Sequence, residues 1–135
     1  MPSIIVGLVP SIIITIGLVP SILLLFDFSP GILYIYTVEY NIEKTETFSA
    51  WLHGLKDVRA KARIRARIER AGKGNLGDWA PEGGEVRAMR IDYGPGYRVY
   101  FTIRGKDIVI LLCGGDKGTQ ETDIALANKL LKEIA

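Results

Sequence analysis

The chain has 135 residues, 48% of them apolar, and its 17 Lys and Arg against 15 Asp and Glu give a net charge of +2. This length suits one domain with a core of its own. The single cysteine excludes an intrachain disulfide and fits a reducing compartment, so we expect a cytoplasmic protein, and with only one histidine beside it a His/Cys metal site is not expected.

Residues 1–36 form an apolar leader with one charged side chain, Asp27, while the other 99 residues carry a net charge of +3. The leader is repetitive, since GLVPSI occurs twice with a ten-residue offset. Residues 1–26 hold no charge and are long enough to span a bilayer. Three interpretations stay open: translation of repeated DNA upstream of the true start, a membrane-inserted segment that would make the protein membrane-associated, and a structured repeat that packs on the domain.

The charged domain, residues 37–135, opens with a strand and two helices. Alternation of apolar and polar residues over 38–42 predicts the strand. A short helix is expected through TFSAWLHGL, capped by Thr45 or Thr47, and a second through VRAKARIRARIERA, capped by Asp57.

The rest of the domain predicts a loop, three strands and a closing helix. GNLGDWAPEGG is typical of a loop, and EVRAMRID, GYRVYFTIR and KDIVILLCG have the composition of strands joined by tight turns. The third strand is apolar on both sides, which places it centrally, and ETDIALANKLLKEI predicts the last helix. The order β-α-α-β-β-β-α predicts an α+β fold, an antiparallel sheet with helices packed on one face.

Four arginines recur along one side of the second predicted helix, within about 80° at 100° per residue. They are Arg59, Arg63, Arg67 and Arg70. A solvated face is the simpler interpretation. Four arginines with no acid among them also suit contact with RNA phosphates or with an acidic protein partner.

Period-two alternation places basic residues on one face of the predicted sheet. Arg98 and Tyr100 share a face of their strand, and Arg90 lies on the same face of the preceding strand. Lys117 follows the third strand and is expected near the end of that surface.

This combination of residue types suits a phosphodiester. Arginine binds phosphate oxygens through a fork of donors and neutralises transition-state charge, lysine adds a point charge, and tyrosine stacks a base or relays a proton. The competing interpretation is a cross-strand ladder of salt bridges with Asp92 and Asp116.

Two runs of the sequence, RIDYGPGYRVYF and LLCGGDKGTQETDIALA, resemble the RelE/HigB-like toxins of bacterial type II toxin–antitoxin systems. The closest likeness is to the phage-derived "addiction module killer protein" subgroup. The run TETFSAWLHGLKDVRAKARIRARI also resembles the usual opening of that subgroup. The resemblance covers about residues 36–135 and implies the RelE-like fold.

The resemblance implies a messenger-RNA interferase, an endoribonuclease that acts mostly on the ribosome and needs no metal or other cofactor. In this family the ribose 2′-hydroxyl attacks the adjacent phosphate. The resemblance also implies a helix-turn-helix (HigA-like) antitoxin as partner. A binding module that has lost catalysis, and a membrane-tethered protein, remain the alternatives.

Residue by residue, Arg98 matches the family's principal phosphate-binding arginine, and Arg90 and Lys117 match basic positions nearby. Arg87, Tyr93 and Tyr97 lie close to them in sequence and are further expected RNA contacts. The C-terminal helix lacks the tyrosine or histidine that some relatives use as acid or base. The proton acceptor therefore stays open between Lys117, Tyr100 and the ribosome.

Overall fold

The computed structural model describes residues 11–15, 22–27, 33–37 and 39–134, with side chains from Glu39 onward. The first three segments are strands that form an antiparallel sheet in the order β1-β2-β3. They are β1 (Ser11–Thr15), β2 (Ile22–Asp27) and β3 (Leu33–Thr37). The rest of the leader lies outside the described residues. The three interpretations of the leader, as an upstream start, a membrane segment or a structured repeat, depend on those residues and stay predictions. In the part of the chain that is described, no helix combines the length and apolar character needed to cross a membrane.

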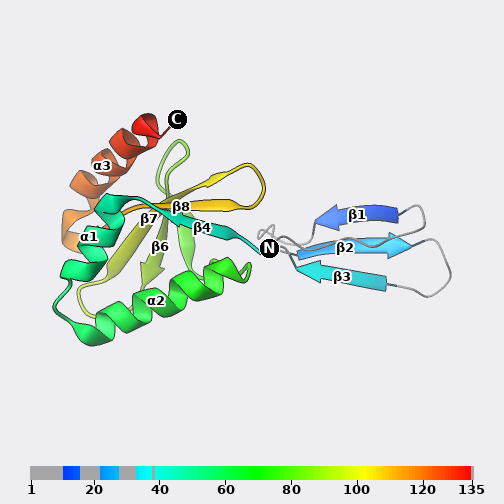
Figure 1. Ribbon diagram of the computed structural model, residues 1–135, viewed down its shortest axis with the longest axis horizontal. Coiled ribbons are helices and arrows are strands. Elements are labelled where there is room, and N and C mark those ends of the chain that lie inside the picture. Colours follow the sequence, from blue (N-terminus) through cyan, green and yellow to red (C-terminus); the bar gives the residue numbers. More distant parts are fainter. Residues whose placement is uncertain (1–10, 16–21, 28–32, 38, 135) are drawn as a thin grey trace.

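The domain is α+β, with five strands, three α-helices and a short 3-10 helix (Figure 1). The strands are β4 (Asn41–Lys44), β5 (Trp79–Pro81), β6 (Arg87–Ile91), β7 (Tyr97–Arg104) and β8 (Ile108–Asp116). The helices are α1 (Glu46–Gly54), α2 (Val58–Gly72), η1 (Lys117–Thr119) and α3 (Gln120–Glu133).

The two predicted helix starts are confirmed. The Thr45 hydroxyl accepts the Phe48 N–H at the start of α1, and the Asp57 carboxylate accepts two N–H groups at the start of α2. These caps satisfy amide groups that have no partner within the helix. The apolar stripe of α2 is also as expected, because Ala60, Ile64 and Ala71 are buried.

The five-stranded sheet has the order β4-β8-β7-β6-β5 and is mixed. The expectation of a wholly antiparallel sheet is wrong, because β4 pairs parallel with β8 while the other pairs are antiparallel. Hydrophobic alternation does not encode the direction of a strand. Two helices and three strands separate β4 from β8 in the sequence, so no tight turn fixes the direction in which they pair. The central position expected for the third predicted strand is confirmed, since β8 lies between β4 and β7.

Strand β5 lies inside the segment predicted as a loop. Its three residues, Trp79 to Pro81, pair with β6 at the edge of the sheet. So short a strand leaves no alternation to detect, and a proline is tolerated in a sheet at an edge. This edge strand leads directly into the turn that carries Glu82.

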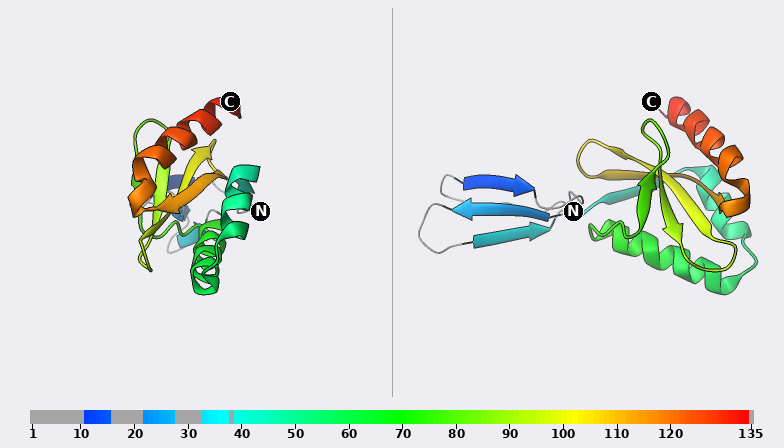
Figure 2. Two further views of the ribbon diagram at one scale, coloured as in Figure 1. Left: turned by 90° about the vertical axis from the view of Figure 1, so that its left-hand side faces the viewer. Right: turned by 180° about the vertical axis from the view of Figure 1, so that it is seen from behind.

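The helices cover both faces of the sheet rather than one (Figures 1 and 2). Phe48 and Leu52 of α1 and Ile64 of α2 pack in one core cluster, whereas Ala127 and Leu130 of α3 pack in a second. The expectation of helices on a single face is therefore wrong. The composition of β8 already indicated cover on both faces, because a central strand that is apolar on both sides must be buried on both sides.

Candidate functional site

Arg90 and Arg98 are direct partners on the adjacent strands β6 and β7. They line a pocket of about 260 Å³, here called the first basic pocket, together with Lys117. Its other lining residues are Asp78, Ile91, Asp92, Gly96 and Tyr97. The three basic residues expected to gather at this edge of the sheet therefore do so.

The turn between β6 and β7 shapes this pocket. Gly94 and Gly96 have φ angles of +57° and +81°, a region that favours glycine over other residues. A Cβ atom at Gly96 would lie 3.5 Å from Cβ of Lys117, so the turn packs directly beside the lysine. Asp116 caps η1 by accepting the Gly118 N–H, which fixes the backbone from which exposed Lys117 extends.

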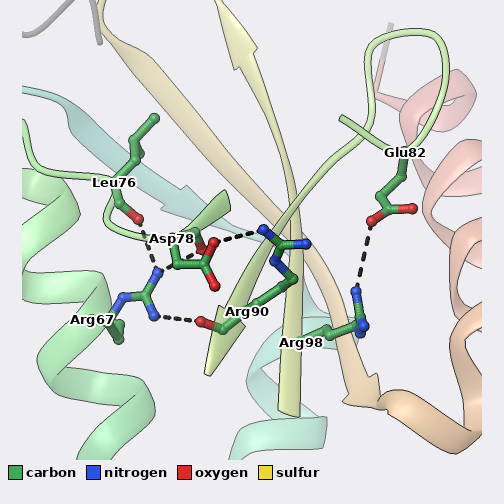
Figure 3. Close-up of polar contacts among 6 residues, drawn as sticks. All are labelled: Arg67, Leu76, Asp78, Glu82, Arg90 and Arg98. Carbon is green, nitrogen blue, oxygen red and sulfur yellow. Dashed lines mark hydrogen bonds and ion pairs between the residues drawn. The ribbon is translucent and has the colours of Figure 1, made fainter. Parts of the chain in front are cut away.

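Arg90 forms a short ion pair with Asp78 on the segment that precedes β5 (Figure 3). Arg90 Nη2 lies 2.7 Å from Asp78 Oδ1, and the side chains are 45% and 61% exposed. The hydrogen bond from Arg90 lowers the pKa of Asp78, and the same bond raises the pKa of Arg90. Because the pair is exposed, water and other anions have access to both groups.

Arg98 faces a different carboxylate, that of Glu82 in the turn between β5 and β6 (Figure 3). The closest atoms are 3.8 Å apart, and only 15% and 14% of the two side chains are exposed. The other carboxylate oxygen of Glu82 accepts a long hydrogen bond, 3.5 Å, from the Gln120 side chain at the start of α3. Glu82 is thus held between Arg98 and α3.

The competing interpretation, a salt-bridge ladder with Asp92 and Asp116, is not seen, because neither residue takes part in the ion pairs described within residues 40–134. Asp92 lines the first basic pocket, and Asp116 is engaged in capping η1. The carboxylates that meet the two arginines come instead from outside the hairpin. Asp78 and Glu82 were both missed as site residues, although each stands in the polar segment GNLGDWAPEGG that was predicted as a loop.

Tyr100 does not lie on an open surface, and its expected role in the site is wrong. It shares a face with Arg98, as alternation predicted, but α3 covers that face at Tyr100 and its side chain is fully buried. Its hydroxyl has no hydrogen-bond partner among the described residues, and burial raises its pKa to about 12. A buried hydroxyl that holds its proton at neutral pH neither stacks a base nor accepts a proton.

Arg87 also lies away from the pocket. It is the cross-strand partner of Phe101, on the face covered by α1 and α2, and its guanidinium group lies 5.7 Å from the centre of the Trp79 ring. Tyr97, by contrast, lines the pocket and packs edge-on against Trp51. Tyr93 is covered by the Arg63 guanidinium group, 4.7 Å from its ring centre.

The four arginines of α2 that were expected to share one side of the helix do not act as one face. Arg67 donates to the carbonyl oxygens of Arg90, Leu76 and Asp78, at 2.5, 3.0 and 3.0 Å, so it fastens β6 and the segment before β5 to the helix (Figure 3). Burial lowers the pKa of Arg67. Arg67 thus has a structural role at this position, and its expected contact with RNA stays a prediction. Arg59, Arg63 and Arg70 are exposed.

These features define the class of the molecule: an α+β domain with a mixed sheet and a basic pocket at one end of its β6–β7 hairpin. Among the described residues, no group of three or more His, Cys, Asp or Glu is arranged to hold a metal ion.

No protein-family model matches the chain. A Haemophilus influenzae protein described as uncharacterized is 50% identical over 93 residues, which cover 69% of this chain and 94% of the relative. The chain belongs to the same family as this H. influenzae protein.

Proposed function

We propose that the protein is a metal-independent endoribonuclease that cleaves messenger RNA and acts as the toxin of a type II toxin–antitoxin pair. The observation that carries the proposal is the meeting of Arg90, Arg98 and Lys117 in one pocket. Three cations from separate segments, of which Arg90 and Lys117 are open to solvent while Arg98 is largely covered, suit a phosphodiester better than they suit a structural role. The resemblance to RelE/HigB-like toxins gives the substrate class.

In this mechanism the ribose 2′-hydroxyl attacks the neighbouring phosphorus and the 5′ oxygen leaves, which yields a 2′,3′-cyclic phosphate. Arg98 and Arg90 donate to the phosphate oxygens, where negative charge builds up in the transition state. Lys117, exposed at the pocket rim, gives a proton to the leaving oxygen.

The proton of the 2′-hydroxyl goes to Glu82. Its carboxylate lies beside Arg98, the arginine that would hold the scissile phosphate. Asp78 is a weaker candidate, because the hydrogen bond from Arg90 lowers its pKa. Tyr100 is excluded as acceptor by its burial.

A second candidate function is a binding module without catalysis, in the cytoplasm, that docks on an antitoxin or on ribosomal RNA. The observation in its favour is that both arginines already face a carboxylate. A helix-turn-helix antitoxin and the ribosome are the proposed partners under either function.

Induction in a bacterial host separates the two functions. We expect the wild-type chain to stop growth and to leave new 5′ ends in translated messages, detected by primer extension. The variant with Arg90, Arg98 and Lys117 all changed to Ala is expected to do neither. A control with Arg65, Lys106 and Lys129 changed to Ala loses the same charge from exposed sites outside the first basic pocket and should remain toxic. Full toxicity of the first variant would rule out the nuclease, and growth arrest without cut ends would favour the binding module.

A further inference from the structure

A second basic pocket, of about 290 Å³, adjoins the first. It is lined by Arg63, Ala66, Arg67, Arg70, Ile91 and Asp92. Ile91 and Asp92 also line the first basic pocket, so the two hollows share a wall at the end of β6. A chain-like ligand can therefore cross from one pocket to the other without leaving the surface.

Positive charge predominates in this second pocket. Three of its six lining residues are arginines and one, Asp92, is an acid. The ion pairs described within residues 40–134 join Lys73 to Glu69, Arg90 to Asp78 and Arg98 to Glu82, so none of them involves Arg63 or Arg70. Burial lowers the pKa of Arg67, and the positive charge of Arg70 lowers it further, as expected for two cations held close together.

The pocket is also preorganised. Arg67 is fixed by three backbone carbonyls, and the Tyr93 ring holds the Arg63 guanidinium group in place. Ordering these side chains before binding reduces the entropy cost when an anion arrives. Arg67 forms the fixed base of the pocket, and exposed Arg63 and Arg70 are the groups placed to contact a ligand.

We infer that the second basic pocket binds a further phosphate of the same single-stranded RNA, so that the strand runs across both pockets. The inference rests on the proposed function for its choice of RNA. The inference also predicts how affinity depends on the length of the RNA. A dinucleotide fills the first basic pocket alone, whereas a longer strand gains affinity from Arg63 and Arg70.

The test measures binding of single-stranded oligonucleotides that lack 2′-hydroxyls, which cannot be cleaved by the proposed route. Fluorescence anisotropy would give affinities for a dinucleotide and a hexanucleotide over a range of salt concentrations. The variant is Arg63→Ala with Arg70→Ala. The matched control is Arg65→Ala with Lys106→Ala, which removes two exposed basic residues that lie outside this pocket.

We expect the variant to bind the hexanucleotide about tenfold or more weakly, while dinucleotide binding stays unchanged. The logarithm of the affinity should also fall less steeply with the logarithm of salt concentration, by roughly 0.7 for each phosphate that the variant no longer binds. Equal weakening in the control would mean a diffuse charge effect and would overturn the inference, as would unchanged hexanucleotide binding in the variant. Because the probe is not cleaved, wild-type binding with the expected length dependence would support this pocket even if the protein proved not to be a nuclease.

Discussion

The carboxylate of Glu82 lies 3.8 Å from the guanidinium group of Arg98, and both side chains are largely buried. The separation is too long for a hydrogen bond, so their attraction is mainly that of opposite charges. The arginine is thus held near the first basic pocket before any substrate arrives. A phosphate that binds Arg98 meets a carboxylate beside it, which either accepts a proton or competes for the arginine.

Glu82→Gln distinguishes these roles. As a general base, Glu82 is expected to contribute about 10²-fold or more to the cleavage rate, and the amide cannot replace it. Binding of non-cleavable RNA should be kept or strengthened, because a negative charge next to the phosphate is removed. Cleavage rates and affinities would be measured on the same RNA sequence.

Glu85→Gln is the matched control, since Glu85 is exposed in the same turn. It should behave as the wild type in both assays. A Glu82→Gln protein that cleaves as fast as the wild type, or faster, would show that Glu82 is only a structural partner of Arg98.

Tyr100→Phe tests the exclusion of this residue from the site. Its buried hydroxyl has no partner, so removing it should leave the free energy of unfolding unchanged or raise it by up to about 1 kcal/mol. Urea unfolding checks the stability, and the cleavage rate should equal that of the wild type. Tyr40 is the other buried tyrosine without a hydroxyl partner within residues 39–134, and Tyr40→Phe should behave alike. Slower cleavage by Tyr100→Phe alone would return the tyrosine to the mechanism.

Gly77→Ala tests the placement of Arg67. Gly77 has a φ of +68°, and an added Cβ would lie 2.8 Å from Arg67 Nη2. Gly105 has a similar φ of +64° with nothing within 4 Å, so Gly105→Ala measures the backbone cost alone, about 1–2 kcal/mol. We expect Gly77→Ala to destabilise further than Gly105→Ala in urea unfolding. Equal destabilisation would mean that Arg67 moves aside freely and that its three hydrogen bonds contribute little.

The buried thiol of Cys113 predicts a decrease of stability in alkali. Burial raises its pKa to about 12, so the folded state keeps the proton after the unfolded chain has released it. This stabilising contribution is complete below the unfolded pKa of about 8.5 and declines as pH rises to about 12, with a slope of up to about 1.4 kcal/mol per pH unit. Cys113→Ala should flatten the fall in the free energy of unfolding over that range, whatever constant cost the smaller side chain adds. An unchanged slope would contradict the burial of the thiol.

Local patterns in the sequence predicted the elements of the domain well. The caps at Thr45 and Asp57 are short-range chemistry, and the structure has both. Alternation correctly placed Arg90 and Arg98 on one face, because the period of a strand fixes which side chains point together.

What failed depends on contacts between distant segments. Alternation could not show that α3 covers Tyr100, since Arg98 on the same face still lines a pocket while Tyr100, two residues later, is fully buried. The helical period placed Arg67 beside Arg63 and Arg70, but the carbonyls that hold Arg67 belong to β6 and the segment before β5. Glu82 carried no signal of its own in the sequence, because its role arises from folding of the β5–β6 turn toward Arg98.

The most direct test of the central claim is the cleavage of a translated message by the purified protein, with and without ribosomes, and the chemistry of the ends it leaves. The proposed mechanism predicts 2′,3′-cyclic phosphate ends and a rate about 10²-fold or more lower for Arg98→Ala, as for the removal of one transition-state donor. Arg104→Ala, on the same strand at its far end, should cleave at the wild-type rate. Cleavage by Arg98→Ala at the wild-type rate, or intact RNA with the wild-type protein under both conditions, would contradict the account.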